Sequence, residues 1–243
     1  MQGIFSHSDY KGTVNQFNHS DCDWSLFQSL HKNVSNNKCP ICEVELNNIP
    51  NNAYSATIDH FRPKAKDMYP YLKCDPDNYI LMCSLCNSRY KKSQFPLIRE
   101  TKRAKTIKEI ANEQPLLFNP AKEQALNFFE LAFRQTPIGN ILELKRKNNI
   151  PKGSYQYQRC EAMIRLFGLG YIHKNIHPDK EAKNLRVDIL TAHYETFIEL
   201  ARAIKDNNKK SFSLILKAKN RKKELEKYGF YHFLLNKQFC IDL

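Results

Sequence analysis

Hydrophobic residues in this sequence recur at helical spacing near the start of the chain and again through its second half. Within residues 21–33, Trp24, Phe27 and Leu30 follow this spacing, which predicts a short helix. Beyond residue 150, large apolar residues return at the same spacing over long stretches. We therefore expect helices over 154–167, 178–204 and 212–228.

Shorter apolar runs between these regions have the length of strands. A strand or hairpin arm is expected over 53–61, and the apolar run 79–82 leads into a helix over 84–92. The other elements that we expect are a basic helix over 99–112 and a hairpin whose arms are 125–133 and 140–145.

Together these elements predict an α+β, mostly helical chain with two domains. The first domain, 1–114, has an N-terminal helix followed by the two short strands. The second, 115–243, has a small hairpin followed by a helical C-terminal region. The aromatic stretch 228–235 either packs back on the long helix or docks a partner protein.

Composition adds a basic charge to this picture. The chain has 243 residues, with 38 Lys and Arg against 25 Asp and Glu, a net charge of +13. Such a surface attracts polyanions, nucleic acid above all, although a lysine-rich composition alone would give the same balance. No apolar run reaches the roughly 18 residues of a membrane span, and residues 1–21 lack a secretory pattern. We expect a cytoplasmic protein without a membrane partner.

Four of the eight cysteines form two Cys-x-x-Cys pairs, Cys39 with Cys42 and Cys83 with Cys86. Two such pairs complete a tetrahedral, structural zinc site with no open position. Residues 43–82 separate the pairs, more than the roughly 15–20 residues of a zinc ribbon, so the zinc would clamp the ends of an insert. Two unrelated pairs of free thiols are the competing interpretation. Because the cytoplasm is reducing, we expect buried free thiols at the isolated cysteines, which are Cys22, Cys74, Cys160 and Cys240.

The insert and its end contain residue types suited to phosphodiester hydrolysis. Asp59 and His60 are adjacent, Asn78 lies further on, and Asn87 directly follows the last cysteine. Imidazole titrates near neutral pH and can act as a general base, while carboxylate and amide oxygens suit Mg²⁺. Each residue also has a structural explanation, since Asn87 could cap a helix and Asn78 could form a turn.

In this order, and inside one cysteine-bounded frame, these residues resemble the ββα-metal core of zinc-containing HNH nucleases. The sequence Thr57-Ile58-Asp59-His60-Phe61-Arg62-Pro63-Lys64 is similar to the narrower PtuB branch, whose members act beside an ATPase in Septu and retron anti-phage systems. Most of the matching motifs lie within residues 39–96, and few lie after them. The other matching stretches are Cys83-Ser84-Leu85-Cys86-Asn87, Phe95-Pro96, 115–120 and Phe167-Gly168-Leu169.

The resemblance implies an endonuclease, acting on DNA in preference to RNA. His60 would be the general base, Asp59 and Asn87 would bind Mg²⁺ or Mn²⁺, and Asn78 would hold the loop that carries His60. The implied partner is an ABC-type ATPase related to PtuA. The spacing from Asn87 to Lys91 is one residue longer than the usual Asn-x-x-Lys of this branch. The basic residues expected to contact phosphates are Arg62, Lys64, Arg89, Lys91 and Lys92.

Two alternatives stay open at this point. The first keeps the chemistry but changes the substrate to tRNA or another host RNA. The second is a zinc-dependent nucleic-acid-binding subunit without catalysis. Four histidines do not fit the motif and are expected to be surface or core residues: His173, His177, His193 and His232.

Overall fold

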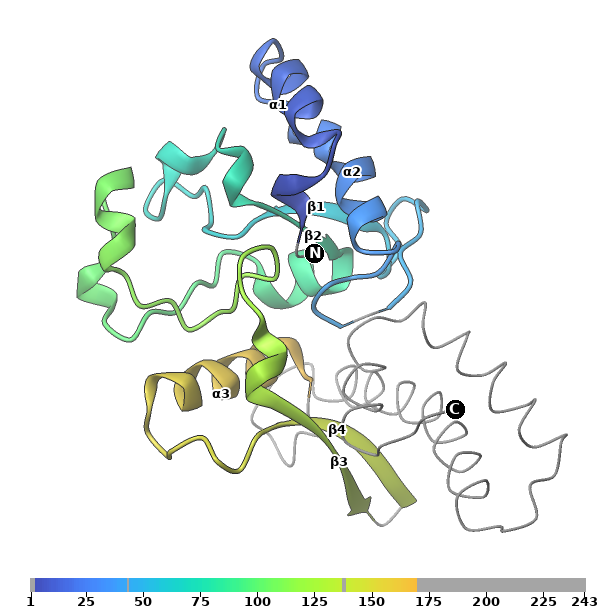
Figure 1. Ribbon diagram of the computed structural model, residues 1–243, viewed down its shortest axis with the longest axis vertical. Coiled ribbons are helices and arrows are strands. Elements are labelled where there is room, and N and C mark those ends of the chain that lie inside the picture. The colour runs from blue at the N-terminus through green and yellow to red at the C-terminus, as the bar shows by residue number, and fades with distance from the viewer. Residues whose placement is uncertain (1–2, 43, 137–138, 170–243) are drawn as a thin grey trace, which may run out of the picture.

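A computed structural model describes residues 3–42, 44–136 and 139–169. This part of the chain is α+β, with two small antiparallel sheets and short helices around them (Figure 1). The α-helices are α1 (Tyr10–Asn18), α2 (Phe27–Val34) and α3 (Tyr155–Phe167), and η5 (Leu85–Lys91) is a π-helix. The strands are β1 (Ala56–His60), β2 (Tyr79–Cys83), β3 (Phe129–Thr136) and β4 (Gly139–Arg146). The 3-10 turns are η1 (Ile4–Ser6), η2 (Trp24–Leu26), η3 (Pro70–Leu72), η4 (Pro76–Asn78), η6 (Glu100–Lys102), η7 (Ile107–Asn112) and η8 (Ala125–Phe128).

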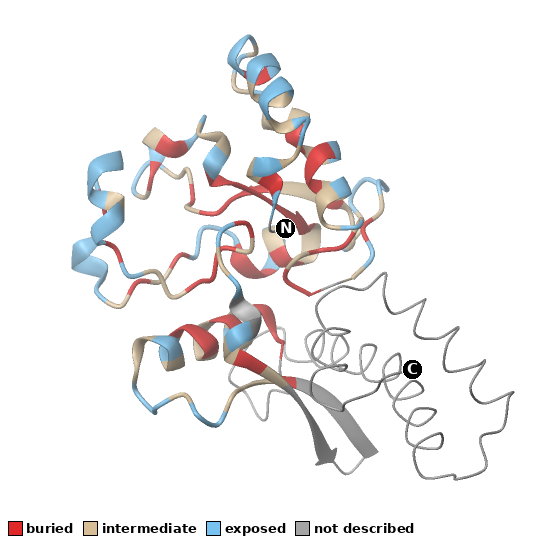
Figure 2. Ribbon diagram, viewed as in Figure 1, coloured by how far each residue is buried: buried red, intermediate tan, exposed pale blue. Residues whose placement is uncertain are grey.

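The first sheet pairs β1 with β2, so that Ala56 lies opposite Cys83 and His60 opposite Tyr79. β-branched residues such as Thr57 favour this pleated backbone. A two-stranded sheet is marginal in water and needs cover. Here α2 contacts both strands and η5 contacts β2. As a result, all five residues of β2 are buried (Figure 2).

The two neighbouring residues at the end of β1 have different surroundings. Side chains alternate between the faces of a strand. The ring of His60 contacts Trp24, which lies just before α2. The carboxylate of Asp59 instead pairs with Lys91 of η5. The two side chains therefore point to opposite faces of the sheet, one toward the N-terminal helices and one toward η5.

The second sheet is the hairpin of β3 and β4, in which Phe129 lies opposite Arg146. Helix α3 contacts both β4 and η5, so it links the hairpin to the first sheet. The Ser154 side chain caps the start of α3 by accepting a hydrogen bond from the Tyr157 amide. Gly168 ends the helix with a φ of 62°, a left-handed conformation that glycine adopts readily.

Several elements match the sequence predictions. The helix within 21–33, the helix 154–167, the helix after Ser84 and the hairpin are confirmed, although the first hairpin arm begins only at Phe129. Helix α1 was not predicted, because its stretch is polar and lacks a clear apolar period. None of the described helices is long and apolar enough to cross a membrane. The helices expected over 178–204 and 212–228, and the stretch 228–235, lie outside the described residues.

The basic helix predicted over 99–112 is wrong. This segment forms two separate turns, η6 and η7, with residues 103–106 between them. The buried carboxylate of Glu113 accepts a hydrogen bond of 2.8 Å from the amide of Ala104. That bond, together with the burial of Ala104, turns the backbone toward the core and so interrupts a continuous helix.

Candidate functional site

The four cysteines of the two pairs meet at one end of the first sheet. Their sulfur atoms all lie within 4.8 Å of one another, and all four residues are buried free thiols. The turn that carries the first pair closes with a hydrogen bond of 3.0 Å from the amide of Cys39 to the carbonyl of Val44. In the second pair, the amide of Cys86 donates to the sulfur of Cys83 at 3.4 Å.

This cluster fits zinc by its donor set and its spacing. Thiolates about 2.3 Å from a tetrahedral zinc lie roughly 3.8 Å from one another. The sulfur atoms of Cys42 and Cys83 are 3.7 Å apart. The adjacent thiols of Cys39 and Cys42 raise the pKa of Cys83, so several thiolates coexist here only when a cation neutralises them. The cluster can therefore hold a metal ion such as zinc and clamp the 43–82 insert.

The carboxylate of Asp59 forms an ion pair with Lys91 of η5. The ammonium nitrogen of Lys91 lies 2.8 Å from Asp59 Oδ2 and donates to the His60 carbonyl oxygen at 2.9 Å. Burial raises the pKa of the Asp59 carboxyl, and the charge of Lys91 opposes that rise. In this structure Lys91 has no exposed surface, unlike the phosphate-contacting residue that the sequence predicts.

A π-helix explains the long spacing between Asn87 and Lys91. The amide of Lys92 bonds the carbonyl of Asn87 at 2.7 Å, five residues back. A π turn takes one residue more than an α turn. Asn87 and Lys91 therefore both face β1, where the Asn87 amide donates to Thr57 Oγ1 at 3.0 Å and Lys91 reaches Asp59.

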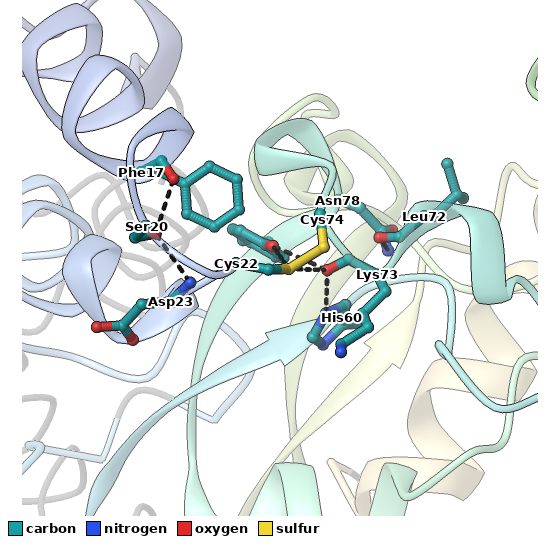
Figure 3. Close-up of a disulfide and its surroundings, with 10 residues drawn as sticks. Phe17, Ser20, Cys22, Asp23, His60, Leu72, Lys73, Cys74 and Asn78 are labelled. Atoms are coloured by element: carbon teal, nitrogen blue, oxygen red, sulfur yellow. Dashed lines mark hydrogen bonds between the residues drawn. A yellow bond between two sulfur atoms is a disulfide. The ribbon is translucent and has the colours of Figure 1, made fainter.

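The imidazole of His60 lies beside Lys73 (Figure 3). Its Nε2 lies 2.8 Å from the carbonyl oxygen of Lys73. Because a carbonyl only accepts hydrogen bonds, Nε2 carries a proton and Nδ1 is the basic nitrogen. Trp24 and Tyr79 contact the ring edge to face. Burial lowers the pKa of His60 to about 4, while the bond to Lys73 partly offsets this.

Asn78 binds the backbone directly after His60. Its Oδ1 accepts a hydrogen bond of 2.8 Å from the Arg62 amide, and its Nδ2 donates to the Arg62 carbonyl at 2.9 Å. Nδ2 also reaches the Leu72 carbonyl at 3.3 Å. These are the contacts that holding the His60 loop requires, and the catalytic role of Asn78 stays a prediction.

Two cysteines expected as free thiols form a disulfide, so that expectation is wrong for Cys22 and Cys74. The bond joins residues 52 apart in the sequence. Figure 3 shows it beside Lys73, whose carbonyl also accepts hydrogen bonds from His60 and Tyr79. The disulfide therefore ties the two segments that line the His60 ring. Cys160 is a buried free thiol, as expected.

The other basic residues near the site have varied environments. The ammonium of Lys64 lies 3.5 Å from the centre of the Trp24 ring, and its charge acts on both Asp59 and His60. Arg62 pairs with the buried carboxylate of Glu113 at 2.9 Å. Arg89 and Lys92 are exposed at the η5 end of the sheet.

Sequence reasoning missed the groups that orient the site from a distance. Trp24, Thr57, Lys73 and Glu113 come from separate segments, and three of them act through long-range side-chain contacts. Lys73 acts through its backbone carbonyl, which no side-chain motif reveals.

Comparisons with protein-family models, curated proteins and solved structures found no match to this chain.

Proposed function

We propose that this chain is an HNH-type endonuclease, resembling the PtuB branch, that hydrolyses DNA with a divalent cation. The observation that supports it most is the strand–strand–helix unit of β1, β2 and η5, clamped at one end by four cysteines. This unit carries the suggested base at the end of β1 and the suggested ligands on β1 and η5.

His60 has the features that a general base needs. Its Nε2 proton is held by the Lys73 carbonyl, so Nδ1 is the nitrogen that takes a proton from water. Burial lowers the pKa of His60 to about 4, so the free ring is a neutral imidazole near pH 7. A phosphate that approaches adds negative charge beside the ring, which favours the protonated imidazole as the reaction proceeds.

The remaining charges suit the scissile phosphate. Asp59 and Asn87 offer a carboxylate and an amide, which are donor types that Mg²⁺ and Mn²⁺ accept. A cation bound there would neutralise charge that develops on the phosphate. The Lys64 ammonium lies over the Trp24 ring, which contacts His60, so it is a positive charge near the suggested base.

The substrate and the biological role are extensions of this proposal. The net charge of +13 favours a polyanionic substrate, which we propose to be DNA. The resemblance to PtuB supports a role as the nuclease of an anti-phage system, regulated by an ABC-type ATPase.

Cleavage of supercoiled plasmid and of tRNA by the zinc-loaded full chain tests the chemistry and the substrate together. Added Mg²⁺ or Mn²⁺ is the variable, since a chelator would also strip the cysteine site. We expect plasmid cleavage that depends on the added cation, and His60→Ala should lower it by roughly 10²–10⁴.

His19→Ala is the matched control, because His19 is exposed and lies outside the site. Wild-type cleavage rates in the His60→Ala protein would refute the catalytic assignment. Cleavage of tRNA alone would keep the chemistry and replace DNA as the substrate.

A further inference from the structure

Lys91 is a fully buried lysine with two acceptors at the end of one strand. Its side chain has no exposed surface, and that of Asp59 is only 9% exposed. The ammonium lies 2.8 Å from Asp59 Oδ2 and 2.9 Å from the His60 carbonyl. It is therefore a fixed positive charge placed on one of the oxygens that a cation would use.

Burying the charged pair of Lys91 and Asp59 costs free energy. Removing two ions from water costs several kcal/mol per ion, and apolar side chains often replace such a pair without loss of stability. The π turn of η5 orients Asn87 toward Thr57, and it also places Lys91 next to Asp59. The pair thus belongs to the geometry of the candidate cation site, not only to the core.

We propose that Lys91 is an internal counter-ion of Asp59 that a divalent cation must displace, so that Lys91 sets the cation affinity of the site. This inference rests on the proposed role of Asp59 as a cation ligand. Lys91 is a positioning residue in this scheme. It holds the carboxylate in its orientation, and it yields Oδ2 to the entering cation.

Displacement follows from distance and charge. A cation about 2.1 Å from Oδ2 would lie roughly 4 Å from the ammonium, which is itself 2.8 Å from that oxygen, and two positive charges this close repel strongly in a buried site. The His60 carbonyl is the second acceptor of Lys91 and can retain the ammonium after it leaves Asp59.

Mn²⁺ binding to the zinc-loaded full chain, measured by electron paramagnetic resonance, tests the proposal without reference to cleavage. Lys91→Met removes the charge and keeps the apolar stem, so the Mn²⁺ dissociation constant should fall by roughly tenfold or more. Lys91→Arg restores the charge and should return the constant toward the wild-type value. Lys66→Met removes the same charge from an exposed position and should leave it unchanged.

An unchanged or weaker Mn²⁺ affinity in folded, zinc-replete Lys91→Met protein would overturn the proposal. If that variant does not fold, the wild-type chain with ¹⁵N-labelled lysine decides the question. Saturating Mg²⁺ should shift the protected ammonium resonance of Lys91, and Mg²⁺ binding without that shift would overturn the proposal. Plasmid cleavage with an unaltered Mn²⁺ affinity in Lys91→Met would refute only this inference. If Lys91→Met binds Mn²⁺ more tightly but neither this variant nor the wild-type chain cleaves plasmid, only the proposed nuclease function would be refuted.

Discussion

Replacing Asn78 with alanine should destabilise the fold and misplace the candidate base. Asn78 is 4% exposed, and its amide makes bonds of 2.8 and 2.9 Å to the Arg62 backbone and a longer one of 3.3 Å to Leu72. Each ordinary hydrogen bond contributes about 1 kcal/mol, and a buried group left without its partner costs about 1–3 kcal/mol. The expected loss for Asn78→Ala is therefore about 3 kcal/mol.

Urea unfolding at a fixed zinc concentration measures this loss. Asn78→Asp should be at least as damaging, because a carboxylate oxygen would then face the carbonyls of Arg62 and Leu72. Asn48→Ala is the control, since Asn48 is exposed and its side chain accepts a hydrogen bond from Lys32, and it should change stability by less than about 0.5 kcal/mol.

Cleavage gives a second readout of the same variant. Below the urea transition, folded Asn78→Ala protein should retain its zinc and cleave roughly a hundredfold more slowly, since a misplacement of about 1 Å has that effect. The reasoning would be refuted by a stability loss under about 1 kcal/mol together with unaltered cleavage.

Two further predictions concern the cysteine cluster and a buried histidine. Cys86→Ser should prevent stable folding, because structural zinc contributes about 10–16 kcal/mol in small zinc domains, and circular dichroism with a zinc assay checks this. A folded Cys86→Ser protein without zinc would contradict it. Burial lowers the pKa of His31 from 6.5 to about 4, so the unfolded chain takes up a proton first as the pH falls. Stability that is present above pH 6.5 should decline by about 3 kcal/mol between pH 6.5 and 4 relative to His31→Leu, measured by urea unfolding, and a pH-independent difference would contradict this.

The sequence was informative where function depends on local spacing. The two Cys-x-x-Cys pairs predicted a four-cysteine cluster, and their sulfur atoms do converge. The short strands, the hairpin and helix α3 were also predictable, because apolar runs, turn residues and helical spacing involve only nearby residues. The roles of Asp59 and His60 follow from resemblance and stay predictions.

The segment 99–112 shows where local reasoning failed. A basic helix was predicted here, yet the Glu113 carboxylate binds the Ala104 amide and also accepts hydrogen bonds from Arg62 and Tyr69. A buried acceptor that gathers donors from several segments outweighs a modest helical propensity. The sequence does not reveal which carboxylate will be buried in this way.

By itself, then, the sequence determined the cysteine frame, the short strands and the candidate residues within them. Only the tertiary structure decided how those residues are used. It joined Cys22 to Cys74, turned His60 toward the Lys73 carbonyl and placed Lys91 on Asp59. Periodicity reports which face of one element is buried, whereas these contacts join groups from different segments. Their energies depend on burial and distance that exist only after the chain has folded.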